Sequence, residues 1–399
     1  MLKYHHKKRG IHMASVGIIA EYNPFHNGHL YQIKEIKKKY PNDTIIIAMS
    51  GNFTQRGEPS MLDKWTKAKL AIENGADLVI EIPYAFTTQS ADFFSYAGIT
   101  LLENLQVEKL IFGSESDNIE DITEIAKAEL ENEDFDKLVK IYSKLGYNYP
   151  TSLSLALKDL TKKVIKEPND ILGITYIKTI LKYNYKIKPI TMQRTNNYNN
   201  KELTGTISSA TAIRENINNL EKIKNTIPKN TYNAITNQKL HQKQDYFNYL
   251  KYKILTEKDL TKYHLVEQDL AIKLKKEIIN STNYDNLIQS VKSKHQTYSK
   301  ISRALLHILC NYTKIQAKKN KKIKYIRLLG FNQEGKNYLN KQKKHLTLPI
   351  ISKISKDKDP MLELELNTTK IYTLPYENQK DEYKKEYQNK LYIKENEYD

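Results

Sequence analysis

The segment VGIIAEYNPFHNGH, residues 16–29, joins three kinds of sequence pattern. Val16–Ala20 is a short apolar, β-branched run of the kind found in buried strands. Asn23, Pro24 and Gly28 supply turn chemistry, and the apolar residues beyond them recur at helical spacing. The segment therefore predicts a strand that runs into a tight turn, with a helix opening inside the pattern His-x-Gly-His.

The His-x-Gly-His pattern, His26 to His29, suits the binding of phosphate. Gly28 has no Cβ, so a nucleotide can lie close to the backbone. A helix N-terminus offers free N–H groups and the positive end of its dipole, and two imidazoles can donate to phosphate oxygens as charge builds up in a transition state. A bare HxxH pattern could also be a zinc pair or two ordinary histidines, but the strand before it and the helix after it favour nucleotide chemistry.

Outward from this segment, apolar runs and helical patterns alternate along the first half of the chain. Further strands are expected at 44–49, 77–82, 109–112 and 187–193, and residues 119–182 read as mostly helical. This alternation predicts a doubly wound, parallel α/β sheet with crossover helices, a Rossmann-like arrangement.

The strand patterns fade beyond about residue 225. Amphipathic helices are expected at 246–255, 270–279 and 301–315, and residues 324–329 have the pattern of one further strand. We therefore expect three parts. They are a leader or upstream start (1–13), an α/β catalytic domain (14–220) and a mainly helical, basic region with a charged C-terminal tail (221–399).

Positive charge is concentrated in the middle of the chain. The formal net charge is +18, and the 64 cationic residues comprise 58 lysines and only six arginines. Residues 1–150 hold 17 Lys and Arg against 21 Asp and Glu, whereas residues 151–350 hold 38 against 14. A basic region beside a mildly acidic domain indicates a polyanionic partner, RNA or DNA, and a solvated lysine-rich surface is the alternative.

Cysteine usage and apolar runs set further limits. The chain has one cysteine, Cys310, so it forms no intramolecular disulfide and no multi-cysteine zinc site. Its longest apolar runs are far shorter than the roughly 20 residues of a membrane helix. We expect a soluble, cytoplasmic protein without a bound metal of its own.

Two loops and three arginines complete the residues expected around a ligand. The loops SGNFTQRGEP (50–59) and FGSE (112–115) follow predicted strands, whose carboxyl ends meet at the ligand crevice of a doubly wound sheet. Arg56, Arg194 and Arg214 all fall in motif-like segments, and the guanidinium fork suits phosphate oxygens. Ordinary βα turns and structural ion pairs are the alternatives.

The order of the motifs has a counterpart in a known family. The motifs are VGIIAEYNPFHNGH, AMSGNFTQRGEP, GADLVIEIP, IFGSE, PNDILGITY and QRT. In this combination the chain resembles the bacterial tRNA(Met) cytidine acetate ligase family of the HxGH nucleotidyltransferase superfamily. The likeness is clear over roughly residues 14–215 and continues more weakly through TYSKISRALLHILCNYTK and YIRLLGFNQEGKNYL.

The resemblance implies a two-step ligase reaction. The family activates acetate with ATP as acetyl-adenylate, and then acetylates the exocyclic amine of the wobble cytidine in elongator tRNA(Met) to give N4-acetylcytidine. ATP is a substrate, Mg²⁺ is expected to accompany it, and no acetyl-CoA takes part. Two other functions remain as alternatives, a metabolite adenylyl- or cytidylyltransferase and a non-catalytic RNA-binding protein that retains a nucleotide fold.

The resemblance also implies site residues. His26 and His29 are the expected catalytic pair. The segment ISSATAIR resembles a superfamily motif whose serines hold the triphosphate, although Ser208 could also be a plain helix N-cap. The expected ATP-binding set is Ile19, Ala20, Glu21, Tyr22, Asn23, Pro24, Phe25, His26, Asn27, Gly28, His29, Leu30, Tyr31, Gln32, Gly113, Asn169, Arg194, Ser208 and Ser209, with Arg56 and Arg214 as further phosphate or substrate candidates.

A tRNA-binding surface is expected near residue 320. Lysines would meet backbone phosphates there, and the interleaved Tyr312 and Tyr325 could stack on an unpaired base. A solvated lysine-rich loop is the alternative. The expected tRNA-binding residues are Lys318, Lys319, Lys321, Lys322, Lys324 and Arg327.

Overall fold

The computed structural model describes residues 14–194, 203, 205–293, 296–355, 359–388 and 391–394. These residues form an eight-stranded sheet in the order β5-β4-β1-β2-β3-β6-β7, with β8 also paired to β6. The first five strands are parallel. Their bounds are β1 (Ser15–Ala20), β2 (Thr44–Ser50), β3 (Leu78–Ile82), β4 (Lys109–Ser114) and β5 (Lys188–Gln193).

The strand order contains a topological switch point between β1 and β4. From β1 the chain builds the sheet in one direction through β2 and β3, and then returns to build it in the other direction through β4 and β5. In doubly wound sheets, ligands bind at the carboxyl ends of the strands at such a point. The α/β fold expected from the sequence is confirmed.

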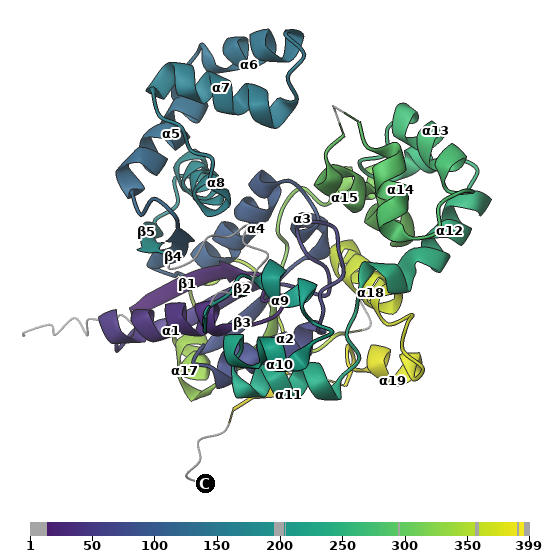
Figure 1. Ribbon diagram of the computed structural model, residues 1–399. Helices are drawn as coiled ribbons and strands as arrows, with labels where there is room; N and C mark the ends of the chain where they lie inside the picture. Colours follow the sequence, from purple (N-terminus) through teal and green to yellow (C-terminus); the bar gives the residue numbers. More distant parts are fainter. Residues whose placement is uncertain are drawn as a thin grey trace, which may run out of the picture.

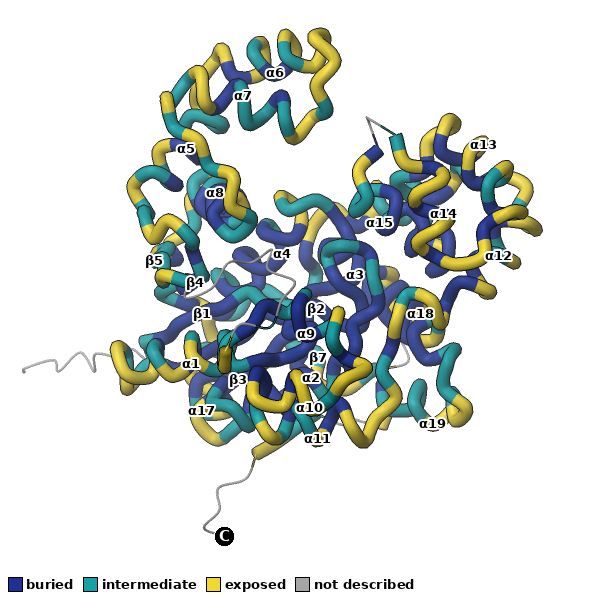
Figure 2. Tube along the Cα trace, in the orientation of Figure 1, coloured by how far each residue is buried: buried dark blue, intermediate teal, exposed yellow. Residues whose placement is uncertain are grey.

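The middle strands are buried on both faces. Ile45 and Ile47 of β2 belong to one apolar core, whereas Ile46 and Ala48 belong to the other, because successive side chains of a strand point to opposite faces. This double burial explains why the strands read as continuous apolar runs. Figure 2 shows the buried residues gathered around the sheet and the exposed ones on the outer turns of α6 and α13.

Helices of the first half cover both faces of the sheet. In Figure 1, α5 to α8 stack above the β4–β5 edge, and α1 lies on the β1 side. The bounds are α1 (Asn27–Lys39), α2 (Lys64–Glu73), α3 (Tyr84–Thr87), α4 (Ala91–Asn104), α5 (Ile119–Glu131), α6 (Phe135–Lys144), α7 (Tyr149–Thr161) and α8 (Pro168–Tyr183).

The second half is mainly helical, as expected. The helices α12 to α15 form a separate group beside the sheet, away from α5 to α8 (Figure 1). No helix in the described part of the chain is both long and apolar enough to span a membrane. The bounds are α9 (Ala210–Glu215), α10 (Leu220–Ile223), α11 (Lys229–Asn237), α12 (Phe247–Thr256), α13 (Gln268–Glu277), α14 (Tyr284–Val291), α15 (Tyr298–Leu309), α16 (Lys314–Lys319), α17 (Gln333–Gln342), α18 (Pro360–Tyr372) and α19 (Gln379–Lys384).

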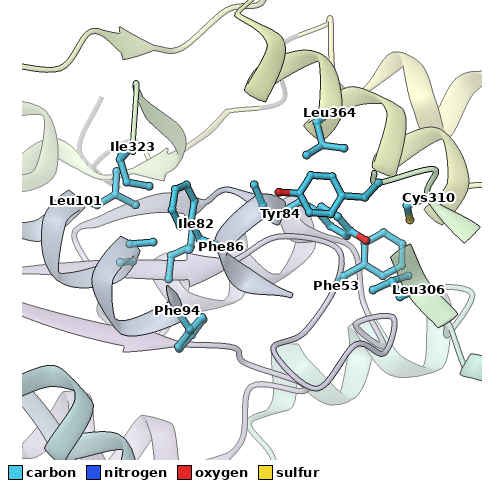
Figure 3. Close-up of a cluster of buried hydrophobic side chains, with 14 of the residues drawn as sticks. Phe53, Ile82, Tyr84, Phe86, Phe94, Leu101, Leu306, Cys310, Ile323 and Leu364 are labelled. Carbon is cyan, nitrogen blue, oxygen red and sulfur yellow. The ribbon is translucent and has the colours of Figure 1, made fainter. Parts of the chain in front are cut away.

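The chain returns to the sheet after α16. The strand expected at 324–329 is β6 (Ile326–Phe331), which pairs antiparallel with β3; β7 (Ile350–Ile351) and β8 (Tyr392–Ile393) then pair with β6. Apolar side chains join the two halves, since Leu306 of α15 and Leu364 of α18 belong to the same core cluster as Phe53 (Figure 3). A division at residue 220 therefore does not separate two cores.

Two helix boundaries differ from the expectation. The helix expected at 301–315 breaks after Leu309, because Asn311 takes a left-handed φ of 57° and Thr313 caps the new helix α16. At α9 the N-cap is Ser209, whose side chain accepts from the Ala212 amide at 3.0 Å, rather than Ser208. Both ends are set by local polar contacts that hydrophobic spacing does not reveal.

A buried charge network corrects one expected RNA contact. Arg327 is only 2% exposed and bonds to Glu386, with Glu81 at 3.5 Å. Lys64, also fully buried, contacts Glu81 at 2.9 Å and Glu386 at 2.8 Å. Because its guanidinium is neutralised inside the protein, Arg327 does not belong to a tRNA-binding surface.

The tyrosines expected to stack on RNA are also buried. Tyr312 is 0% and Tyr325 2% exposed, so neither ring can receive a base. Lys324 lies 3.2 Å from Asp359. Lys318, Lys319, Lys321 and Lys322 are exposed, on the end of α16 and the coil that follows it.

Candidate nucleotide site

A pocket of about 210 Å³ opens at the switch point, at the carboxyl ends of β1 and β4. Several segments that are distant in the sequence converge on it because the parallel strands end at the same edge. Its lining includes Ile18–Asn23, His26, His29, Gln32, Thr54–Arg56, Glu58, Phe94, Phe112, Gly113, Asn169, Leu172, Tyr176, Arg194, Ala210, Thr211 and Arg214. An adjoining pocket of about 70 Å³ adds Gly28, Tyr31, Ser208 and Ser209.

The two histidines cap helix α1 together. The Gly28 amide donates to Nδ1 of His26 at 3.0 Å, and the His26 amide donates to Nδ1 of His29 at 3.2 Å. This arrangement is a capping box in which imidazoles replace the usual hydroxyl and carboxylate. Their rings stack with centroids 3.7 Å apart.

The capping bonds fix the tautomer of both rings. Since each Nδ1 accepts a backbone N–H, it carries no proton, and the ring proton is assigned to Nε2. Burial and the charges of Arg194 and Arg214 lower the pKa of His26 from 6.5 to about 3. Burial, His26 and Arg194 lower the pKa of His29 well below its usual value. At neutral pH the pair therefore offers two neutral Nε2–H donors.

Aromatic packing holds the rings from behind. Tyr22 meets His29 edge-on at 4.7 Å between centroids and Phe25 at 4.8 Å. Tyr22 is buried and has a left-handed φ of 48°, which few residues other than glycine adopt. The turn is therefore held in a strained shape that points the tyrosine ring at His29.

Gly28 is required by close packing under the histidine pair. A Cβ at this position would lie 2.8 Å from Cε1 of His26, which is closer than real Cβ contacts allow. A side chain here would push the His26 ring out of its cap. The glycine thus serves the histidine geometry as well as the approach of a nucleotide.

A second wall of the pocket, at Gly113, Asn169 and Arg194, is held by two carboxylates that exchange hydrogen bonds. Asp170 accepts from the amides of Glu115 and Ser116, both at 3.1 Å. In return, Glu115 accepts from the amides of Asn169 at 3.2 Å and Asp170 at 3.3 Å, and from the side chain of Asn169. This exchange ties the loop after β4 to the N-terminus of α8.

Glu115 also orients the arginine of this wall. Nε of Arg194 lies 3.6 Å from Glu115 Oε1, and the arginine side chain packs over Gly113, where a Cβ would be 3.2 Å away. Gly113, Asn169 and Arg194 are therefore brought together around one carboxylate, as their joint assignment to ATP implies.

The third arginine ties α9 to the turn before α1. Nη1 of Arg214 donates to the Asn23 carbonyl at 2.7 Å, and Nη2 donates to Thr211 at 3.2 Å. Arg214 and Arg56 line the larger pocket, and Ser208 and Ser209 line the smaller one. The cationic groups thus surround the histidine pair.

Four residues of the expected ATP segment do not line either pocket. Phe25 is fully buried beneath His29, and Leu30 packs on the core of the α1 face. The Asn27 side chain donates to the carbonyls of Thr206 and Asn225 at 2.8 and 2.9 Å. Pro24 also lies outside the lining, so these residues shape the turn rather than face a ligand.

Sequence reasoning missed several residues of the site. Glu115, two residues after Gly113 in the predicted loop, lines neither of these pockets, and its partner Asp170 is 55 positions away in the sequence. Phe94, Phe112, Leu172 and Tyr176 form an apolar part of the lining. The spacing of these apolar residues is typical of a buried core. Only Phe112 could have been predicted to line the pocket, because it precedes Gly113 in the loop 112–115.

No group of three or more His, Cys, Asp or Glu side chains that could hold a metal ion is found in the described part of the chain. We assign no step of the reaction to a metal ion. That Mg²⁺ arrives with ATP stays a prediction.

The fold and the site together define a nucleotidyltransferase with a His-x-Gly-His helix cap. Residues 13–388 match the family described as HIGH Nucleotidyl Transferase. The tRNA(Met) cytidine acetate ligase of Caldicellulosiruptor saccharolyticus is 40% identical over 379 residues, covering 91% of this chain and 94% of its own; that of Bacillus subtilis is 35% identical, with 92% and 93% covered. The chain belongs to the tRNA(Met) cytidine acetate ligase family.

Solved structures support the same assignment. The crystal structure of Thermotoga maritima TmcAL without ligand has a TM-score of 0.89 and 27% identity, and covers 96% of this chain and 100% of that one. The same protein bound to alpha-thio ATP has a TM-score of 0.87 at the same coverage. This chain therefore has the fold of an ATP-binding enzyme.

Proposed function

We propose that this chain activates acetate with ATP and transfers the acetyl group to the wobble cytidine of elongator tRNA(Met). The observation that carries the proposal is the pair of Nε2–H donors at the start of α1, set in a pocket ringed by Arg56, Arg194 and Arg214. The names of the relatives supply the tRNA and the acetyl donor. The enzyme would act in the cytoplasm, where tRNA is found.

In the first step, a carboxylate oxygen of acetate attacks the α-phosphorus of ATP. The bond from that phosphorus to the bridging oxygen breaks, and pyrophosphate leaves. His26 and His29 would donate from Nε2 to phosphate oxygens, whose negative charge redistributes in the transition state. Asn169 and Arg194 would hold the nucleoside side of ATP.

In the second step, the exocyclic amine of the cytidine attacks the acyl carbon. The bond from that carbon to the phosphate oxygen breaks, AMP leaves, and the amine loses one proton. The small apolar part of the lining, which includes Phe94 and Tyr176, suits an acetyl methyl group better than a long acyl chain. Carboxylates larger than acetate should therefore be poor substrates.

The RNA would lie over the exposed lysines after α15. Lys318, Lys319, Lys321 and Lys322 are exposed on one short stretch, and no acidic residue interrupts them in the sequence. Lysines in such a run meet phosphates without reading sequence. We therefore expect them to contribute affinity, and base recognition to come from elsewhere.

ATP–pyrophosphate exchange tests the proposal. We expect exchange that requires acetate but not tRNA, followed by N4-acetylcytidine in tRNA(Met), detected by mass spectrometry of its nucleosides. Exchange with another metabolite and none with acetate would favour the metabolite transferase. A complete lack of exchange together with tight tRNA binding would favour the non-catalytic RNA-binding protein.

A further inference from the structure

Helix α2 carries a fully buried lysine whose ammonium group donates to three backbone carbonyls. Nζ of Lys67 donates to the carbonyls of Glu21 at 2.9 Å, Ser50 at 3.0 Å and Gly51 at 2.8 Å. Its side chain is 0% exposed. An ammonium group has three protons, so these three carbonyls use all of them.

This lysine differs from its neighbour on the same buried face. Lys64, one turn earlier, is paired with Glu81 and Glu386. Within the described residues Lys67 forms no ion pair, and burying a charge without one is costly. The Lys67 ammonium group is buried and bonds to three carbonyls, so we infer that it has a role that an apolar side chain could not perform.

The three carbonyls lie at the starts of the two loops that line the nucleotide pocket. Glu21 directly follows β1 and precedes Tyr22, whose strained backbone sets its ring against His29. Ser50 ends β2, and Gly51 begins the loop that contains Thr54–Arg56. The loops also meet directly, because the Gln55 amide donates to Oε1 of Glu21 at 2.6 Å.

We propose that Lys67 is a positioning residue that clamps the ends of β1 and β2 together and so sets the histidine pair for attack at the α-phosphate. The clamp acts through Glu21 and the strained Tyr22 on His29. It also fixes the start of the loop that carries Arg56. Misplacing a catalytic group by about 1 Å can cost on the order of 100-fold in rate.

Protonation gives the clamp a measurable signature. Burial lowers the pKa of Lys67 to about 7, opposed by the carboxylates of Glu21, Asp63 and Glu81 and reinforced by the charge of Lys64. Above that pH the amine would retain two protons for three carbonyls. The clamp should therefore loosen as pH rises through about 7, and the rate should fall while the protein stays folded.

The test compares Lys67→Met, Lys67→Arg and the control Lys69→Met, which removes a 54% exposed lysine from the same helix. Lys67→Met should lower kcat for ATP–pyrophosphate exchange roughly 10- to 100-fold, with KM for ATP changed much less because the Asn169 and Arg194 wall is intact. Lys67→Arg, whose guanidinium keeps its proton, should restore part of the rate and abolish its decline above about pH 7.

The inference about Lys67 rests on the exchange reaction of the proposed function, but the outcomes of the test distinguish the two. A wild-type protein without acetate-dependent exchange contradicts the function. Wild-type exchange together with a Lys67→Met kcat within about twofold of it overturns the clamp. Should Lys67→Met fail to fold, judged by its thermal melt, the pH profiles of wild type and Lys67→Arg decide, and identical profiles for the two overturn the clamp.

Discussion

The two walls of the nucleotide pocket are held by different physical means. The histidine wall, from β1 to α1, is one continuous segment whose side chains are fixed by capping bonds to their own backbone. The other wall, the carboxylate wall, joins the β4 loop, α8 and Arg194, and depends on two carboxylates that exchange hydrogen bonds across more than 50 residues. The first is fixed by bonds within one short segment, whereas the second depends on how separate elements pack against each other.

This difference predicts which kinetic constant each wall controls. A rigid cap that presents Nε2–H donors should act on the transition state, and so on kcat. A wall assembled around Glu115 should act on nucleotide binding, and so on KM. Substitutions in the two walls can therefore confirm or break the comparison.

The largest effect is expected from the histidine wall. His29→Ala should lower the rate of acetyl-adenylate formation on the order of 100-fold or more, comparable to removing one oxyanion-hole donor. Exchange kinetics at saturating ATP measure this loss. A matched change on the exposed face of α1, Lys38→Ala, should leave the rate unaltered. Stoichiometric zinc that disappears in His26→Ala would instead show that the pair is a metal site.

A smaller effect is expected from the carboxylate wall. Glu115→Ala removes the acceptor that orients Asn169 and Arg194, so KM for ATP should rise roughly tenfold with kcat nearly constant, equivalent to about 1.4 kcal/mol. Steady-state exchange over a range of ATP concentrations separates the two constants. Glu120→Ala, an exposed residue just after the same loop, serves as the control. A fall in kcat alone would show that the two walls do not divide the work in this way.

The same contrast explains what the sequence could and could not predict. The strand, the turn and the start of α1 are contiguous in the sequence, so their order and spacing predicted the strand–turn–helix, although not that the two histidines cap the helix. The partnership of Glu115 with Asp170 depends on how α8 packs beside β4, and no local pattern carries that information. The apolar lining at Phe94 and Tyr176 was hidden for the same reason, since such residues usually belong to a core.

Arg327 shows the opposite error, where a local pattern was misleading. It stands at the end of a lysine run, and the run indicated a solvent-facing patch. In the structure β6 carries it into the sheet, where glutamates from β3 and from beyond α19 neutralise it. A run of charged residues predicts an exposed surface only where the chain remains at the surface. The strand pattern at 324–329 indicates that the chain enters the sheet there, so it was the available evidence that Arg327 is buried.

The histidine wall should also make the stability of the protein depend on pH, because His26 belongs to it. The folded-state pKa of His26 is about 3, below its ordinary 6.5. Between these values the unfolded chain binds a proton that the folded chain does not, so the free energy of unfolding should fall as pH drops below about 6.5. The slope for one such group is at most about 1.4 kcal/mol per pH unit.

Urea unfolding at about pH 7 and pH 5 measures this effect. His26→Asn keeps a good N-cap but cannot titrate, so its stability should depend less on pH than that of the wild type. Equal pH dependence in the two proteins would mean that His26 does not carry the shift, and that other buried histidines such as His241, whose pKa burial lowers to about 3, account for the acid sensitivity.

The smallest effect is expected outside both walls, at the exposed lysines. Replacing Lys319, Lys321 and Lys322 with glutamine should weaken tRNA binding and flatten its salt dependence, by roughly 0.7–0.9 in the log–log slope for each phosphate that a lysine no longer neutralises. Binding measured at several salt concentrations gives this slope. Adenylate formation without tRNA should be unaltered, because the lysines do not line the nucleotide pockets.

Arg327 provides the internal contrast for this surface. Since its guanidinium is buried and paired, Arg327→Gln should lower the thermal midpoint and leave the salt slope of tRNA binding as in the wild type, measured at a temperature where the variant is folded. The lysine triple variant should do the reverse. If the triple variant binds tRNA with normal affinity and an unaltered salt slope, the lysine run is only a solvated surface. The tRNA must then bind to other lysines among residues 151–350.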